Sequence, residues 1–113
     1  MEAKDLALDM EEAAQAFAAL GSGQRLSVLQ ALVAAGPDGL PAGALADKTG
    51  IVASTLTHHL RFLSQAGLIT QRRQGRSVIS TAAFGQVERL SRYLLLNCCA
   101  DAECPARKDH IHG

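Results

Sequence analysis

The chain contains no tryptophan and only one tyrosine, Tyr93, so large aromatic side chains cannot dominate its core. Three phenylalanines are the only other large aromatics, which leaves leucine, alanine and valine as the main material of a chain that is 48% hydrophobic. Leucine and alanine are strong helix formers. With 113 residues the chain has room for one modest domain. We therefore expect a single, mainly helical domain without an extensive catalytic apparatus.

Long apolar runs are also missing. No segment approaches the roughly 20 apolar residues of a membrane-spanning helix, and no signal-peptide pattern opens the chain. We therefore expect a cytoplasmic protein with no membrane partner. Cysteine is scarce, with three residues in all. In a reducing compartment these are expected to be thiols that capture a metal ion or react, because structural disulfides are rare there.

The chain has no net charge, and this alone gives it no attraction to nucleic acid. The neutrality is a cancellation between segments. Residues 1–12 carry five acidic residues and one lysine. Residues 54–92 contain one acid, Glu88, and a series of arginines: Arg61, Arg72, Arg73, Arg76, Arg89 and Arg92. We therefore expect a local basic face in the middle of the chain.

Hydrophobic spacing and turn residues predict the secondary structure. Four helices are expected, in chain order, at about residues 9–19, 24–35, 41–49 and 53–66. The third of these would carry Pro41 in its first turn and end at Gly50. Two short strands, 68–71 and 77–81, would then flank a basic turn at residues 72–76.

A last helix is predicted from Phe84 to about Asn97, and it is more hydrophobic than one core contact requires. Its apolar residues are Phe84, Val87, Leu90 and Leu94 on one face, widened by Tyr93, Leu95 and Leu96. The surplus indicates a partner helix, so we expect a homodimer joined by the first and last helices. Residues 105–113 are polar and unpatterned and are expected to be a flexible tail behind a domain of residues 1–104.

The order of the central elements is that of a winged helix-turn-helix. A short helix, a tight turn at Gly50, a second helix that begins with small polar residues and a basic hairpin follow one another. Such a helix fits the major groove of double-stranded DNA, and arginines on the hairpin reach phosphates or the minor groove. The sequence thus predicts a mainly α fold with a small β-hairpin wing, in the order ααααββα. The alternative is a solvated helix and turn without a DNA partner.

Several segments carry a family resemblance. ALGSGQRL (residues 19–26) opens the second predicted helix, and STLTHHLRFL (residues 54–63) is followed by AGLI (66–69) and RRQGR (72–76). In order and spacing these segments resemble the second helix, recognition helix and wing of the ArsR/SmtB family of metalloregulatory repressors. The resemblance covers residues 19–82, although the family usually has Asp or Ser and then Pro where Gly21–Gly23 stand.

The resemblance implies DNA contacts for particular residues. On the recognition helix Ser54, Thr57 and His58 would face bases or backbone, with Ala53 and Arg61 beside them. On the wing, Arg73 and Arg76 would contact DNA. The neighbouring His59 is instead expected to pack inward with a hydrogen bond.

The candidate ligand residues indicate which ion such a repressor would sense. The family's Cys-x-Val-Cys arsenic motif corresponds to the cysteine-free segment 43–47, and the last predicted helix lacks the histidine of the zinc-type site. The remaining candidates, Cys98, Cys99 and Cys104, resemble the C-terminal three-cysteine site of some arsenic-responsive members. Three thiolates suit As(III) or Sb(III), whose lone pair occupies the fourth direction. We therefore expect such an ion as inducer and no organic cofactor.

Ion capture should reshape the end of the last helix. Adjacent cysteines in a regular helix point about 100° apart, so Cys98 and Cys99 can share an ion only if the helix unwinds near Asn97 and Cys104 closes the set. If this helix joins the dimer, the spacing of the two recognition helices changes and the operator is released.

Other interpretations stay open. The cysteines could be buried core residues, Cys104 could pair with Cys98 or Cys99 on oxidation, or His110 or His112 could complete a zinc or lead site. The choice among arsenite, antimonite and a methylated arsenical is open, as is whether one chain or both supply the sulfurs. An enzyme such as an arsenate reductase is not expected, because thiolates are disfavoured at a helix C-terminus. A protein-interaction module with this fold would differ in lacking salt-dependent operator binding.

Overall fold

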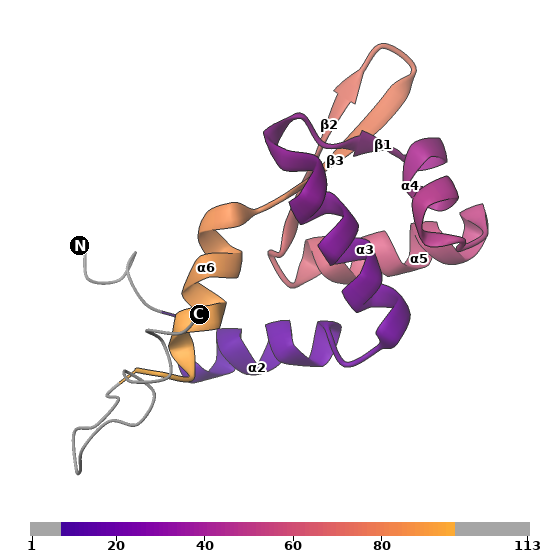
Figure 1. Ribbon diagram of the computed structural model, residues 1–113. Helices are drawn as coiled ribbons and strands as arrows, with labels where there is room; N and C mark the ends of the chain where they lie inside the picture. Colours follow the sequence, from indigo (N-terminus) through magenta and orange to yellow (C-terminus); the bar gives the residue numbers. More distant parts are fainter. Residues whose placement is uncertain (1–7, 97–113) are drawn as a thin grey trace, which may run out of the picture.

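Short turns separate the helices of the computed structural model, which describes residues 8–96 (Figure 1). The elements are α2 (Met10–Ala19), α3 (Gly23–Ala35), η1 (Gly36–Asp38), β1 (Leu40–Pro41), α4 (Ala42–Thr49), α5 (Ala53–Gln65), β2 (Ile69–Gln74), β3 (Ser77–Ala82) and α6 (Phe84–Tyr93). This order confirms the winged helix-turn-helix predicted from the sequence. None of the helices described is long and apolar enough to cross a membrane.

Local sequence explains where the first two helices begin. Asp9 caps α2 by accepting a hydrogen bond from the backbone N–H of Glu12, whose carboxylate accepts one from the N–H of Asp9 in return. Ser22 caps α3 by accepting a hydrogen bond from the N–H of Arg25. The serine thus provides a helix start at the place where the sequence departs from the family pattern.

The core lies where the helices meet and consists mainly of leucine and alanine, as the composition predicted. Leu32, Leu45 and Leu63 have no exposed surface, and alanines of α2 such as Ala16 pack in the same cluster. Small alanines allow α2 to approach α5 and α6 closely. Packing of these aliphatic side chains fixes the relative positions of the helices that carry the functional site.

The sheet has one strand more than the sequence indicated. β1 pairs with β3, and β3 pairs with β2, so the order is β1-β3-β2 and both pairings are antiparallel. Pro41 was predicted inside a helix but belongs to β1 and forms the N-cap of α4. A two-residue strand leaves no hydrophobic alternation in the sequence, which is why it was missed. Gly39 permits the pairing, because its φ is 71° and a Cβ there would clash with the backbone of Ser80.

The wing strands are longer than predicted. β2 extends to Gln74 and β3 starts at Ser77, so only Gly75 and Arg76 form the turn. Arg72 and Arg73, expected in the turn, are therefore strand residues. The hairpin projects beyond the helices at the top of Figure 1.

The last helix is shorter than predicted. α6 ends at Tyr93, and residues 94–96 form turns in which the N–H groups of Leu95 and Leu96 bond to carbonyls three residues earlier. Leu90 is buried as expected, but Phe84 and Leu94, which were expected on the same core face, are 40% and 73% exposed. Asn97, the predicted helix end, and the boundary at residue 104 lie outside the described residues.

Candidate DNA-binding site

Helices α4 and α5 and the turn between them form the helix-turn-helix. Gly50 adopts a left-handed conformation with φ of 73°, and its N–H donates to the carbonyl oxygen of Ala46 at 2.8 Å, which ends α4. Ile51, just before the N-cap of α5, and Leu56, in the first turns of α5, both belong to the core cluster. Apolar residues at these two positions fix the direction in which a helix leaves a turn. The local sequence therefore orients α5.

The exposed side of α5 carries the residues predicted to contact DNA. All five are exposed: Ala53, Ser54, Thr57, His58 and Arg61. The Thr57 hydroxyl donates to the carbonyl oxygen of Ala53 at 3.0 Å. Its proton is therefore held within the helix, and its oxygen can serve a base or a bound water only as an acceptor.

An open groove of about 460 Å³ lies between α5 and the wing. Its polar and apolar lining comes from both elements and includes Thr57, Arg61, Ser64, Gln71, Val78 and Ser80. Hydroxyl, amide and guanidinium groups are the side chains that bind phosphate and sugar oxygens in protein–DNA complexes. The groove thus joins α5 and the wing into one surface that carries polar groups from both elements. Ser64 and Gln71 were not among the predicted site residues, since the groove that they line depends on how the wing packs beside α5 and has no local sequence signal.

Arg72 and Arg73 lie on opposite faces of the wing, because successive residues of a strand alternate. Arg73 shares a face with Gln71, and its partner across the ladder is Val78; both of these residues line the groove. Arg76 is exposed in the hairpin turn. Arg73 therefore lies on the groove side of the wing, and Arg76 lies at its tip.

Arg72, on the other face, ties the wing to the rest of the domain. Its guanidinium donates to Oγ1 of Thr81 at 3.1 Å and to the backbone oxygen of Asp38 at 3.0 Å. Asp38 ends η1, so this side chain connects the outer wing strand to the segment before β1. Arg72 braces the wing, a role that the sequence did not reveal.

The first turn of α3 supports α5 from behind. Nε of Arg25 donates to the carbonyl oxygen of Ala19 at the end of α2, and the guanidinium lies 4.8 Å from the ring centroid of Phe62 on α5. Beside it, Oε1 of Gln24 lies 2.9 Å from Nε2 of His59. Arg25 therefore contacts α2 and α5 together, and a shift of one helix relative to the other must disturb it.

His59 is buried and hydrogen-bonded, as predicted, and not exposed with its neighbour His58. Because Oε1 of Gln24 is an acceptor, we place the proton of the neutral ring on Nε2. Nδ1 is buried and has no hydrogen-bond partner among the described residues. Burial lowers the pKa of His59 from its usual 6.5, and the positive charge of Arg25 and the proximity of His58 lower it further. A neutral imidazole is thus part of the packing behind α5.

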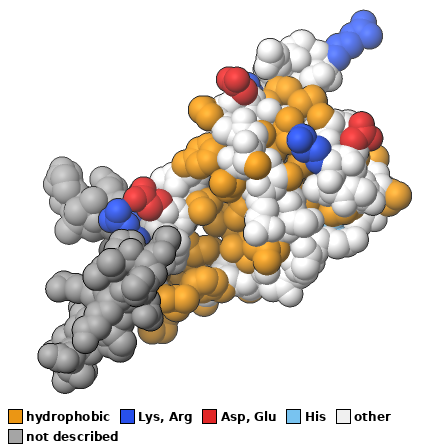
Figure 2. Space-filling view, in the orientation of Figure 1, with side chains coloured by type: hydrophobic (Ala, Val, Ile, Leu, Met, Phe, Trp, Pro, Cys, Tyr) orange, Lys and Arg blue, Asp and Glu red, His pale blue; other side chains and the backbone are white. Residues whose placement is uncertain are grey.

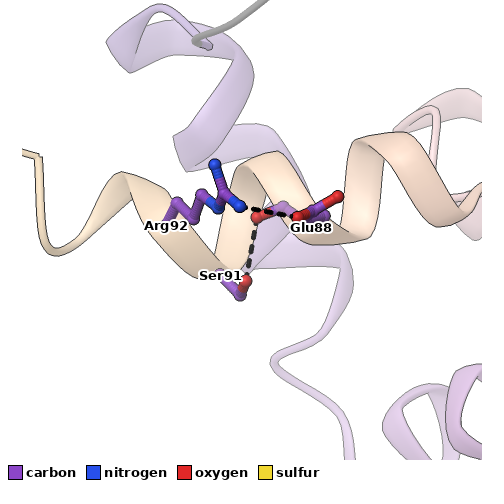
Figure 3. A network of polar contacts seen from close by, with 3 residues as sticks. All are labelled: Glu88, Ser91 and Arg92. Carbon is purple, nitrogen blue, oxygen red and sulfur yellow. Dashed lines mark hydrogen bonds and ion pairs between the residues drawn. The ribbon is translucent and has the colours of Figure 1, made fainter. Parts of the chain in front are cut away.

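The arginines expected on one basic face are divided between two parts of the fold. Arg61, Arg73 and Arg76 lie on α5 and the wing, whereas Arg89 and Arg92 lie on α6. On α6, Nη2 of Arg92 contacts Oε2 of Glu88 at 2.8 Å, and the Ser91 hydroxyl donates to the Glu88 carbonyl oxygen (Figure 3). Such an exposed pair stabilises the helix by about 0.3–0.5 kcal/mol.

The predicted ion ligands Cys98, Cys99 and Cys104 lie outside the described residues, as do His110 and His112. Within residues 8–96, no group of three or more His, Cys, Asp or Glu side chains could hold a metal ion.

A family model described as a helix-turn-helix domain matches residues 20–72. An ArsR-like transcriptional regulator from Rhodococcus sp. RHA1 is 26% identical with a TM-score of 0.66, and the match covers 77% of this chain and 78% of that one. A possible transcriptional regulatory protein from Mycobacterium bovis, solved as fragment 1–100, is 30% identical with a TM-score of 0.62, over 72% of this chain and 84% of that one.

A solution structure of fragment 1–100 of a possible ArsR-family regulator from Mycobacterium bovis, described as a homodimeric winged helix-turn-helix DNA-binding domain, has a TM-score of 0.62 at 24% identity. That match covers 78% of this chain and 77% of the other. A search of curated proteins gives no match.

The chain belongs to the ArsR family. It is a DNA-binding transcriptional regulator of this family and not an enzyme, in agreement with the sequence. For an ArsR-family regulator, the exposed side of α5 and the groove beneath the wing are the candidate DNA interface.

Proposed function

We propose that this protein is a homodimeric repressor that leaves its operator when As(III), or Sb(III), binds Cys98, Cys99 and Cys104. The observation that carries the proposal is the position of α6. This helix starts directly after the wing strand β3, packs against α2, and ends a few residues before Cys98. A change at the thiols therefore reaches both the proposed dimer contact and the DNA-binding region through one short helix.

The proposed dimer contact is the apolar surface of α2, α6 and the turns at residues 94–96. Its exposed hydrophobic residues are Met10, Phe17, Leu94, Leu95 and Leu96. Figure 2 shows hydrophobic side chains gathered over the region where α2 and α6 meet. An exposed apolar patch of this kind marks an interaction site in a small protein. A second copy is the natural partner, since the related Mycobacterium bovis domain is described as homodimeric.

The symmetry of the proposed dimer determines the kind of operator that it can bind. Two α5 helices related by twofold symmetry can enter successive major grooves of a palindromic site, with Ser54, Thr57 and His58 near the bases. Arg61, Arg73 and Arg76 would contact phosphates beside the groove between α5 and the wing. Because these arginines lie on α5 and the wing, local attraction to DNA is consistent with a net charge of zero.

The donor set favours a soft ion. Three thiolates can bind As(III) or Sb(III) in a pyramid, and carboxylate ligands are not required. The α-helix ends at Tyr93 and residues 94–96 form turns, so the helix already stops before Asn97, the position near which ion capture was expected to unwind it. Ion capture would then reorder residues 94–96, which belong to the proposed dimer contact, and change the spacing between the two α5 helices.

The test uses an operator selected from random duplex DNA and the reduced full-length protein. Cys99→Ser should bind this operator as tightly as the wild type but respond only weakly to arsenite in a gel-shift assay. Cys98→Ser and Cys104→Ser should behave in the same way, and Ser91→Ala on the exposed side of α6 serves as the control. Unimpaired release of Cys99→Ser by arsenite would rule out the three-thiol site.

The alternative inducers give different results in parallel titrations. Release by zinc or lead, lost in His110→Ala or His112→Ala, would establish a mixed cysteine–histidine site. Release by peroxide and recovery with a reductant, without a response to arsenite, would identify a thiol redox switch on the same fold.

A further inference from the structure

The N-cap of α5, the helix proposed to read DNA, is Val52. No side chain caps this helix, although its first N–H groups need partners. Serine, threonine, aspartate and asparagine are the stabilising residues at this position, and valine is among the poorest. Helices α4 and α6 also start without a side-chain cap, whereas Asp9 and Ser22 cap α2 and α3 with their side chains. The start of α5 is therefore built less favourably than the starts of α2 and α3.

Core packing does not explain the valine. Its side chain is 67% exposed, whereas its neighbour Ile51 is 5% exposed and belongs to the core. The hydrophobic contact that orients α5 is thus available from Ile51 and Leu56 without Val52. An apolar, branched side chain that neither caps its helix nor packs in the core does not stabilise the fold locally. Residues of this kind, which break a local rule of stability, concentrate at functional sites.

The surroundings of Val52 indicate what it contacts. It directly precedes Ala53 and Ser54, at the end of α5 that enters the major groove first in a helix-turn-helix complex. In that groove the thymine C5-methyl group is the apolar feature of a base edge, and small apolar side chains recognise it. We infer that Val52 is a specificity-determining residue that contacts a thymine methyl group in each operator half-site. This inference rests on the proposed function, since it requires operator binding.

The test replaces one methyl group at a time. Wild-type protein first selects its operator from random duplex DNA, and each thymine of a half-site is then replaced by uracil, which lacks only the methyl group. Fluorescence anisotropy should show one thymine at which the replacement weakens wild-type binding by about fourfold, the factor expected for burying one methyl-sized group. Replacement in both half-sites should weaken binding by about sixteenfold, the product of the two factors.

Two variants separate base recognition from folding. Val52→Ala should bind the thymine and uracil operators equally well. Val52→Asn should also lose the distinction, but it should raise the melting temperature because asparagine caps the helix. Val33→Ala, at an exposed valine of α3 outside the DNA-binding site, should keep the wild-type preference.

The outcomes distinguish this inference from the proposal on which it depends. If Val52→Ala binds the operator and keeps the wild-type response to uracil at every position, Val52 does not read thymine, although DNA binding stands. If Val52→Ala instead dissociates the dimer in sedimentation experiments, the valine is a protein contact and the inference is wrong. If the wild type selects no DNA sequence, the proposed function itself fails, and the inference fails with it.

Discussion

The two neighbouring arginines of β2 should have separable effects on DNA binding. Arg73 is on the groove side of the wing with Gln71, whereas Arg72 is held on the other face by Thr81 and the Asp38 carbonyl. Substitution of either residue by alanine removes one positive charge, so a purely long-range electrostatic effect would be the same for both. A difference between them can arise only from their contacts.

The expected magnitudes follow from those contacts. Each phosphate contact contributes about 0.9 to the slope of log K against log salt concentration, so Arg73→Ala in both chains of a dimer should lower that slope by about 1.8. Arg72→Ala removes two hydrogen bonds at an exposed site and should cost on the order of 1 kcal/mol of stability. For a domain of this size, that loss lowers the melting temperature by about 4–8 °C.

The assay is operator binding by fluorescence anisotropy over a series of salt concentrations, together with thermal unfolding of each variant. Arg73→Ala should have a reduced slope and a nearly unchanged melting temperature. Arg72→Ala should melt earlier and bind more weakly, with a slope close to that of the wild type. The assignment of faces would be refuted if Arg72→Ala lowered the slope as much as Arg73→Ala and left the melting temperature unchanged.

Three further predictions concern the pairing of β1 with β3, the buried His59 and the proposed dimer contact. Gly39→Ala should lower the free energy of unfolding by about 1–3 kcal/mol in urea titrations, because the φ of Gly39 is positive and a Cβ would clash with Ser80. Gly43→Ala, in open space within α4, should instead raise the free energy of unfolding by about 0.5–1 kcal/mol. Equal effects of the two substitutions would contradict the close approach at Gly39. Folding lowers the pKa of His59, so below pH 6.5 the unfolded state binds a proton more readily than the folded state does. The free energy of unfolding should therefore decrease as the pH is lowered below 6.5. His59→Gln should flatten this dependence, and a parallel curve would exclude His59 as its source. Leu95→Glu should give a monomer in analytical ultracentrifugation and lose high-affinity operator binding, because it places a charge in the proposed dimer contact; an unchanged dimer would mean that the contact lies elsewhere.

The helices and the general fold could be predicted because their signals are local. Leucine spacing, the Ser22 cap and the glycine at position 50 define where the helices begin and end, and the predicted bounds of α2, α3 and α5 each differ from the observed ones by one residue at one end. The inward position of His59 also followed from helical periodicity. These features depend on residues within a few positions of one another in the chain.

The features that were missed depend on distant parts of the chain. β1 exists because Leu40 and Pro41 meet Ser80 and Ile79, and the role of Arg72 depends on Asp38, so neither has a local signature.

The end of α6 was placed too late because Leu94–Leu96 continue the hydrophobic spacing of a helix. In the structure these leucines are exposed in turns, so hydrophobicity there does not report helix length. For the wing, strand periodicity would have separated Arg72 from Arg73 had the strands been given their full length.

We propose that this ArsR-family regulator leaves DNA when its thiols bind As(III) or Sb(III). The most direct measurement is the anisotropy of labelled operator bound to reduced full-length protein during titration with arsenite. We expect release near stoichiometric arsenite, reversal by a competing dithiol, and only weak release in Cys98→Ser, Cys99→Ser or Cys104→Ser. Persistent operator binding in a large excess of arsenite would contradict it.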